Sequence, residues 1–104
     1  MRIEQIGDWT LEDILGVGGK PVVVRFYETG GKSVASRRDF LKVAHEHPNA
    51  RFYEVDLVEN PTLARRYSIA HAPVVLVFIN GVEVARQAGD LMATTVDRAL
   101  GNST

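Results

Sequence analysis

The sequence predicts an α/β protein whose central sheet is mixed and carries helices on both faces. Strand-like and helix-like segments alternate through most of the chain, which is typical of parallel strands joined by helices. Two runs, residues 21–27 and 73–79, are almost entirely apolar, as expected for central strands covered on both faces. After the second run, Asn80-Gly81 predicts a tight turn into an antiparallel strand. The sheet should therefore contain both parallel and antiparallel pairs.

Four elements are expected in the first half of the chain. Residues 2–6 form a short strand, and a helix follows for which Thr10 is the expected N-cap. The glycine-rich residues 16–20 end that helix and lead into the strand at residues 21–27. Residues 33–45 form a second helix, which a His-Pro-Asn sequence ends. The apolar residues expected to face the core are Leu11, Ile14 and Leu15 in the first helix, and Phe40, Leu41 and Ala44 in the second.

The second half predicts three strands and two helices. Residues 51–57 form a strand with alternating burial, and a short helix begins at Asn60-Pro61, because Asn caps helices and Pro fits their first position. Residues 73–79 and 82–87 form the hairpin, and residues 91–100 form a last amphipathic helix. The residues expected to be buried are Phe52, Val55 and Leu57 in the strand at residues 51–57, and Leu91, Val96, Ala99 and Leu100 in the last helix.

The composition narrows the class of protein. A chain of 104 residues with 45% apolar and 24% charged residues suits a single domain over residues 1–104 with one core. Its net charge of -1 does not favour binding to nucleic acid or to an anionic membrane. The apolar runs are too short to span a bilayer, and the N-terminus lacks the apolar core of a signal peptide. A cytoplasmic protein is therefore expected.

The chain contains no cysteine. Disulfides, thiolate metal sites and thiol catalysis are therefore excluded. The histidines do not predict a metal site either, since His45 and His47 are too close in sequence to share a helical face. His71, just before Ala72-Pro73, has no carboxylate or thiolate partner in the sequence nearby, so it is expected to be a loop or groove residue and not a metal ligand. Neither a metal nor a cofactor is expected.

The order of the elements and several local strings resemble the thioredoxin family. The string KPVVVRFYE is similar to the family's strand before its active-site turn, and VDLVENPTLARRYSIAHAPVVLVFINGVEV is similar to the family's second half. The resemblance covers residues 3–100. It implies the thioredoxin fold, with its elements in the order βαβαβαββα, and a cis peptide bond between Ala72 and Pro73.

The functional motif of the family is missing. The family places Cys-Gly-Pro-Cys, preceded by Trp, after this strand. Here the motif positions fall on Gly30, Gly31, Lys32 and Ser33, and Thr29 stands in place of the Trp. Glycine has no reactive group, and a serine hydroxyl cannot form a mixed disulfide. The chain is therefore predicted to be redox-inactive and not a thiol–disulfide oxidoreductase, and no catalytic residue is predicted.

A second departure concerns a pair of charges beneath the motif. The resemblance places the family's buried Asp at Arg25 and its neighbouring Lys at Glu54, so that the two charges are exchanged. An unpaired buried guanidinium is costly, which predicts an ion pair between Arg25 and Glu54. The alternative is that Arg25 extends past Tyr27 to solvent.

The string Gly30-Gly31-Lys32-Ser33 also suggests nucleotide binding. A phosphate-binding loop would require a glycine at position 26, where Phe26 stands, so an NTPase is rejected. Two weaker alternatives remain: Lys32 and Ser33 at a helix N-terminus could bind an anion, or Ser33 could activate a thiol such as glutathione, as serine does in glutathione transferases. The plain structural interpretation is a tight turn, with Ser33 capping the helix and Lys32 in solvent.

The resemblance also implies a peptide-binding groove. Substrate proteins of the family lie as extended segments beside the motif, and such strand addition requires no sulfur. We expect a protein or extended-peptide partner in this groove, in an adaptor, assembly or chaperone role. The groove could instead be inherited but unused, or a partner could supply the thiols. The positions that the resemblance assigns to the groove are Thr29, Gly30, Gly31, Lys32, Ser33, His71, Ala72, Pro73, Ala88, Gly89, Leu91 and Met92.

Overall fold

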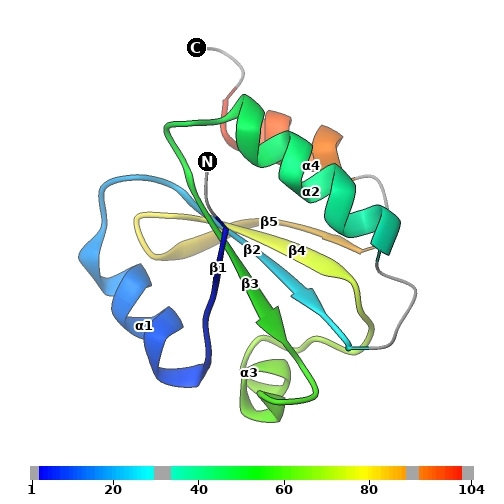
Figure 1. Ribbon diagram of the computed structural model, residues 1–104. Helices are drawn as coiled ribbons and strands as arrows, with labels where there is room; N and C mark the ends of the chain where they lie inside the picture. The colour runs from blue at the N-terminus through cyan, green and yellow to red at the C-terminus, as the bar shows by residue number, and fades with distance from the viewer. Residues whose placement is uncertain (1–2, 30–33, 89–91, 102–104) are drawn as a thin grey trace.

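The computed structural model describes residues 3–29, 34–88 and 92–101 (Figure 1). Within these ranges the chain forms one five-stranded sheet, in the order β1-β3-β2-β4-β5, together with helices α1 to α4. The βαβαβαββα order of elements confirms the predicted one. The elements are β1 (Glu4–Gln5), α1 (Asp8–Val17), β2 (Val22–Tyr27), α2 (Val34–Glu46), β3 (Arg51–Asp56), α3 (Pro61–Arg66), β4 (Val74–Ile79), β5 (Val82–Ala88) and α4 (Met92–Ala99).

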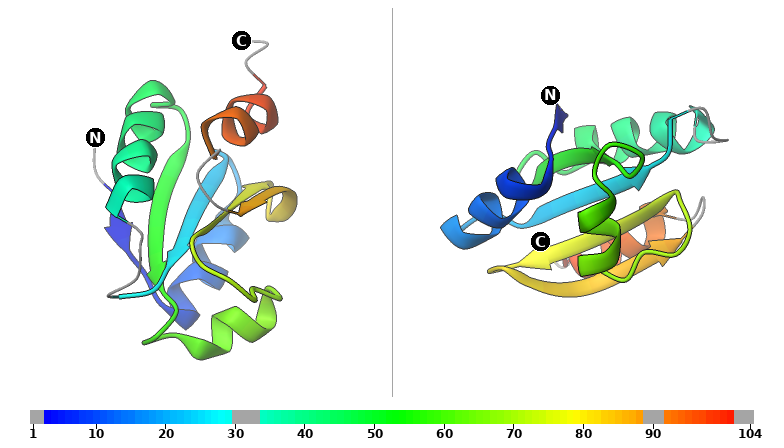
Figure 2. Two further views of the ribbon diagram at one scale, coloured as in Figure 1. Left: turned by 90° about the vertical axis from the view of Figure 1, so that its right-hand side faces the viewer. Right: turned by 90° about the horizontal axis from the view of Figure 1, so that it is seen from below.

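The sheet is mixed, as predicted. β1 and β2 each pair with β3 in parallel, whereas β4 is antiparallel to β2 and β5 is antiparallel to β4. Helices α2 and α4 cover one face of the sheet, and α1 and α3 cover the other (Figure 1 and Figure 2). This arrangement confirms the α/β class with helices on both faces. It also places the C-terminal ends of β2 and β3 and the start of β4 at the same end of the sheet.

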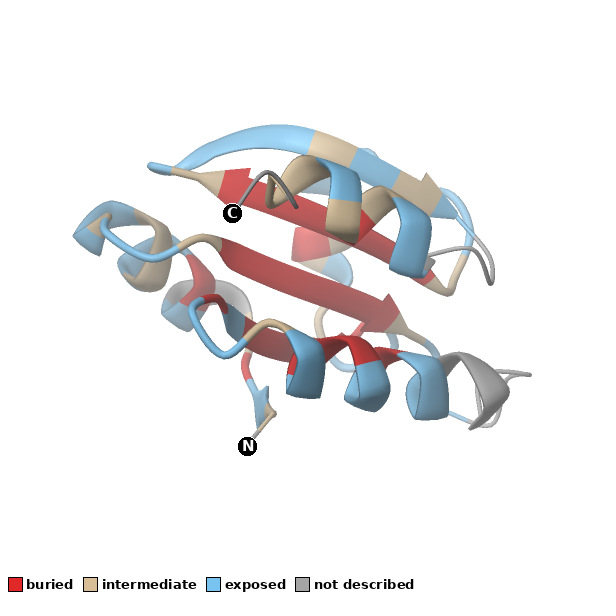
Figure 3. Ribbon diagram, turned by 90° about the horizontal axis from the view of Figure 1, so that it is seen from above, coloured by how far each residue is buried: buried red, intermediate tan, exposed pale blue. Residues whose placement is uncertain are grey.

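The two apolar runs form the central strands. β2 and β4 are neighbours, and in each of them every residue except the last is buried. Figure 3 shows these buried strands beside the exposed β5 at the edge. Their side chains alternate between two apolar clusters, so that Val24 and Phe26 pack toward α1 and α3, and Val23 packs toward α2 and α4. Burial on both faces explains why these strands lack polar alternation.

The first helix begins earlier than the sequence indicates. α1 starts at Asp8 with Gly7 at its N-cap, so the prediction of Thr10 as N-cap is wrong and Thr10 lies inside the helix. The carbonyl of Gly7 accepts a hydrogen bond of 3.2 Å from the N–H of Leu11. Leu11 is fully buried, and the hydrogen bond joins it to the first turn of the helix.

The inward face of α2 differs by one position from the predicted face. Leu41 was expected in the core, but its side chain is 41% exposed, and Val43 is buried instead. Phe40, Val43 and Ala44 form the buried face, which is the spacing that one side of a helix presents. Leu41 follows Phe40 directly, so it lies about 100° around the helix from that residue and points toward solvent.

The burial of β3 also differs from the alternation predicted. Tyr53 and Glu54 are buried along with Phe52 and Val55. β3 lies between β1 and β2 and has helices over both faces, so neither face is open to water. Leu57 lies beyond the end of the strand, where it is only partly buried against the cluster that faces α1 and α3.

The hairpin forms at the predicted turn, and its second strand contains a bulge. Asn80 and Gly81 have φ values of 52° and 81°, which match the mirror-image turn that joins twisted strands. The pairing then shifts between Val77 and Phe78, which leaves Val84 as an extra residue in β5. The bulge places Glu83 and Arg86 on the same face of the sheet, where Arg86 Nε lies 2.9 Å from the Glu83 carboxylate.

Candidate functional site

The candidate site lies where β2 and β3 end and β4 begins. Phe26 pairs with Val74 across β2 and β4, and Val74 pairs with Ala88 at the end of β5. Thr29 follows β2 and Pro73 directly precedes β4, so this end of the sheet brings together predicted groove residues that are distant in sequence. In open α/β folds, binding sites usually lie in the loops at the carboxyl ends of the parallel strands.

Several predicted groove positions lie outside the described residues. The list comprises Gly30, Gly31, Lys32, Ser33, Gly89 and Leu91. Met92 begins α4, but its side chain also falls outside the description. The anion-binding and serine-based hypotheses depend on Lys32 and Ser33, and they stay predictions.

The loop before β4 contains the predicted cis bond, between Ala72 and Pro73. The side chain of His71 is exposed, and Ala72 and Pro73 are partly buried. Within the described part of the chain, neither His71 nor Ala72 makes a hydrogen bond. A surface pocket of ≈ 380 Å³ borders the same loop, and its lining is Ala64, Arg65, Ser68, Ile69 and Ala70.

Asp56 is a residue of the site that the sequence prediction missed. Its carboxylate accepts a hydrogen bond from the Thr29 hydroxyl and another, 2.9 Å long, from the backbone N–H of Val58. The Thr29 hydrogen bond contributes most to a lowered pKa of Asp56, and backbone N–H groups of Val58, Thr29 and Glu59 add to the effect, whereas burial opposes it. Asp56 therefore joins the loop after β2 to the loop after β3.

Asn60 closes the second of these loops. Its backbone N–H and its side-chain amide each donate a hydrogen bond of 3.0 Å to the carbonyl oxygen of Asp56. The loop is thus held at both ends, and the side chain of Val58 between them is 62% exposed. An exposed valine on a fixed loop offers apolar contact area at the edge of the site. The predicted start of α3 is confirmed, with Asn60 at the N-cap position and Pro61 next, although the Asn60 side chain makes no capping hydrogen bond.

Arg25 and Glu54 form the ion pair that the exchange of charges predicts. Arg25 Nη1 lies 2.7 Å from Glu54 Oε2, and each side chain is only 1% exposed. The two residues are Cα partners across β2 and β3, so their side chains leave the sheet on the same face. The alternative in which Arg25 extends to solvent is therefore wrong. Burial lowers the pKa of Arg25, and the facing Glu54 carboxylate opposes this shift.

Gln5, Tyr27 and Arg37 connect this ion pair to the surface. None of them was predicted from the sequence as a partner of the pair. Glu54 accepts a hydrogen bond of 3.3 Å from the side-chain amide of Gln5 and lies 3.4 Å from Nε of Arg37, which is half exposed. The Tyr27 ring lies 5.2 Å from the Arg25 guanidinium, and its hydroxyl donates to Gln5. The Glu54 carboxylate thus has several partners, which a buried charge requires.

No group of His, Cys, Asp and Glu side chains in the described ranges is placed to hold a metal ion. None of the helices within those ranges has the length and apolar character needed to cross a bilayer.

Comparisons with known proteins bear directly on the resemblance. No family model matches the sequence. The chain is 32% identical over 87 residues to a thioredoxin of Mycoplasma genitalium, an alignment that covers 83% of this chain and 84% of that protein. It is 36% identical over 71 residues to thioredoxin-1 of Saccharomyces cerevisiae, with 67% of this chain and 69% of the yeast protein covered.

The fold agrees with solved thioredoxin structures. Thioredoxin f from spinach chloroplast superposes with a TM-score of 0.86 at 23% identity, over 98% of this chain and 93% of the spinach chain. At that identity the structural likeness supports the thioredoxin fold, while the sequence relatives support common descent. The chain therefore belongs to the thioredoxin family, and it does so without a cysteine.

Proposed function

We propose that this chain is a redox-inactive member of the thioredoxin family that binds an extended segment of a partner protein. Thiol–disulfide exchange requires a thiolate, and the chain has none. The fold and the loop before β4 are nevertheless retained. The role is that of an adaptor, assembly factor or chaperone, and the cytoplasmic location expected from the sequence belongs to the same proposal.

The observation that carries the proposal is the open backbone of the loop before β4. His71 and Ala72 make no hydrogen bond within the described part of the chain, and His71 is exposed. An extended segment can pair with such groups as an added strand, which supplies affinity through main-chain hydrogen bonds. Exposed Val58 would supply an apolar contact on the loop after β3.

The hydrogen bonds of Asp56 support the same proposal. They hold Thr29 and the backbone of Val58 against Asp56 before any partner arrives. A partner that binds a fixed surface loses less conformational entropy than one that must order the loops. Thr29 stands where the resemblance places the family's Trp, and its hydroxyl ties this residue to Asp56.

Site-specific photo-crosslinking tests the proposal. A photoreactive amino acid at the exposed position 71 should form a specific protein adduct in cells of the source organism. The same residue at position 17 is the matched control, since Val17 is 75% exposed and precedes β2 at the opposite end of the sheet from Thr29. Adducts from position 71 alone would support the proposal. The same adducts from both positions, or none from position 71, would contradict it.

A further inference from the structure

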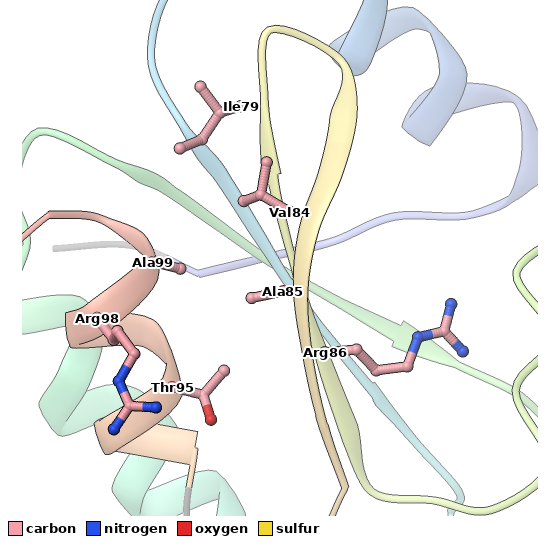
Figure 4. A pocket seen from close by; sticks show the side chains of 7 residues that line it. All are labelled: Ile79, Val84, Ala85, Arg86, Thr95, Arg98 and Ala99. Carbon is pink, nitrogen blue, oxygen red and sulfur yellow. The ribbon is translucent and has the colours of Figure 1, made fainter.

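A second pocket lies between α4 and the hairpin, away from the candidate site. It has a volume of ≈ 650 Å³, within the range of about 300–1,000 Å³ that small-molecule sites occupy. Its lining residues are Ile79, Val84, Ala85, Arg86, Thr95, Arg98 and Ala99 (Figure 4). Pro73 and Ile79 lie about 20 Å apart along β4 at the usual strand rise, so this inference does not depend on the proposed function.

The pocket has a clear structural origin. Ala85 on β5 and Ala99 on α4 are the small residues that line the gap between the strand and the helix (Figure 4). Two methyl groups cannot fill the space that larger apolar side chains occupy elsewhere in the core. The bulge at Val84 also bends the strand where the pocket forms. Ile79 and Val84 complete an apolar wall, and Val84 is 49% exposed.

The charges in the lining have one sign. Two arginines contribute, and none of the described residues that line the pocket is acidic. Arg86 is already engaged, since it pairs with Glu83 and donates to the carbonyl oxygens of Tyr67 and Ser68. Figure 4 shows its side chain extending away from α4.

The charge of Arg98 is not compensated in the same way. Among the described residues, no carboxylate lies within ion-pair distance of its guanidinium. The adjacent Asp97 is engaged elsewhere, because its carboxylate lies 2.6 Å from Nε2 of His47. Thr95, one turn earlier on α4, donates its hydroxyl hydrogen to Gln87 and can still accept a hydrogen bond. The pocket thus combines an apolar wall with a cation that has no carboxylate partner in the described part of the chain.

We propose that this pocket binds a small amphipathic carboxylate. The apolar body would lie between Ala85 and Ala99, and the carboxylate would pair with the guanidinium of Arg98. Guanidinium groups bind carboxylates with two parallel hydrogen bonds, which favours an acid over a neutral molecule of the same shape. The apolar wall favours a hydrocarbon chain over a short, fully hydrated acid.

Chemical-shift titration of the isotopically labelled protein tests this proposal. Sodium octanoate is the probe, with octan-1-ol as the uncharged match and sodium acetate as the match without an apolar chain. Octanoate should give saturable shifts at the amides of Val84, Ala85, Thr95 and Ala99. Acetate should give none there, and octanol should bind more weakly. Because Arg98 is exposed and partly screened, the change Arg98→Gln should weaken octanoate binding by about threefold to tenfold.

Two further variants make the result decisive. Arg38→Gln removes an exposed arginine of α2 and should leave octanoate affinity unchanged. Ala99→Leu should fill the gap and abolish binding while the fold, monitored by the same spectra, is kept. The proposal is overturned if octanoate gives no saturable shifts at the pocket. It is also overturned if Arg98→Gln and Arg38→Gln have the same effect on affinity, or if octanol binds as tightly as octanoate.

Discussion

Arg25 and Glu54 face each other across the parallel pair of β2 and β3, with 2.7 Å between guanidinium and carboxylate and 1% exposure for each side chain. The resemblance to the thioredoxin family implies the opposite charges at these two positions, an Asp in place of Arg25 and a Lys in place of Glu54. The structure thus has a buried ion pair at these two positions, with the polarity opposite to the one the resemblance implies for the family. A buried pair of this kind is costly to break but adds little net stability over an apolar pair.

The first prediction follows from this asymmetry. Arg25→Met alone should lower the free energy of unfolding by about 3–5 kcal/mol, because Glu54 would keep a buried charge with fewer partners. The double change Arg25→Met with Glu54→Leu should restore much of that loss. Urea denaturation of the four proteins in the mutant cycle measures both effects.

The exposed pair of Arg66 and Glu12 serves as the control for this cycle. Its side chains are 37% and 50% exposed, so breaking it should cost at most about 1 kcal/mol. If Arg25→Met cost no more than Arg66→Met, the ion pair would not have the structural importance assigned to it.

The second prediction concerns the contribution of Asp56 to the stability of the protein at low pH. Its folded-state pKa lies below the ordinary value of 3.8, so the ionised form stabilises the fold. That contribution is complete above the ordinary pKa and is lost as the pH falls from there through the lower folded-state value. Asp56→Asn should destabilise the protein by about 1–3 kcal/mol at pH 7 and reduce the loss of stability on acidification. Denaturation curves at neutral and acidic pH give both quantities.

Asp39 provides the comparison for this measurement. It is an exposed aspartate on α2, and Asp39→Asn should leave the free energy of unfolding at pH 7 nearly unchanged. If Asp56→Asn lost as much stability on acidification as the wild-type protein does, the hydrogen bonds from Thr29 and Val58 would not stabilise the carboxylate.

The third prediction contrasts two glycines. Gly81 has a φ of 81°, and a Cβ there would lie 3.1 Å from the carbonyl oxygen of Leu15, so Gly81→Ala should cost about 1–2 kcal/mol. Gly16 is helical, and nothing lies within 4 Å of a Cβ placed there. Gly16→Ala should therefore stabilise the protein by about 0.5–1 kcal/mol. Opposite shifts in thermal midpoint are expected, and shifts of the same sign would contradict the backbone assignment.

The fourth prediction concerns redox chemistry. With no thiol in the chain, the purified protein should not catalyse insulin reduction by dithiothreitol at any pH. It should also support no NADPH oxidation with thioredoxin reductase. A thioredoxin with both cysteines is the positive control. Turnover above the buffer blank would refute the assignment as redox-inactive.

Most of the fold could be predicted from the sequence because its strongest signals are local. The apolar runs, the Asn60-Pro61 helix start and the Asn80-Gly81 turn each specify their own element. The errors occur where tertiary packing decides the outcome. Thr10 has the better capping side chain, but α1 already begins at Asp8, with Gly7 at the N-cap position. Leu41 is apolar, but the contact between α2 and the sheet uses Val43.

The candidate site could be predicted only in part. The resemblance pointed to Thr29 and the loop before β4, and the exchanged charges pointed to Arg25 and Glu54. Asp56 was missed, because its hydrogen bond to Thr29 joins residues that are far apart in sequence. The available signal was an aspartate at the end of a buried strand, directly before a turn. Periodicity alone cannot assign a partner to such a side chain.

The protein is proposed to bind a partner segment at the loop before β4 without redox chemistry. The most direct test is an amide chemical-shift map of the labelled protein with the segment that crosslinks to position 71, recorded in excess reductant. The largest shifts are predicted at Thr29, His71, Ala72 and Ala88, with the same affinity when reductant is absent. Shifts confined to α1 or to the pocket at Arg98, or binding that disappears on reduction, would contradict the claim.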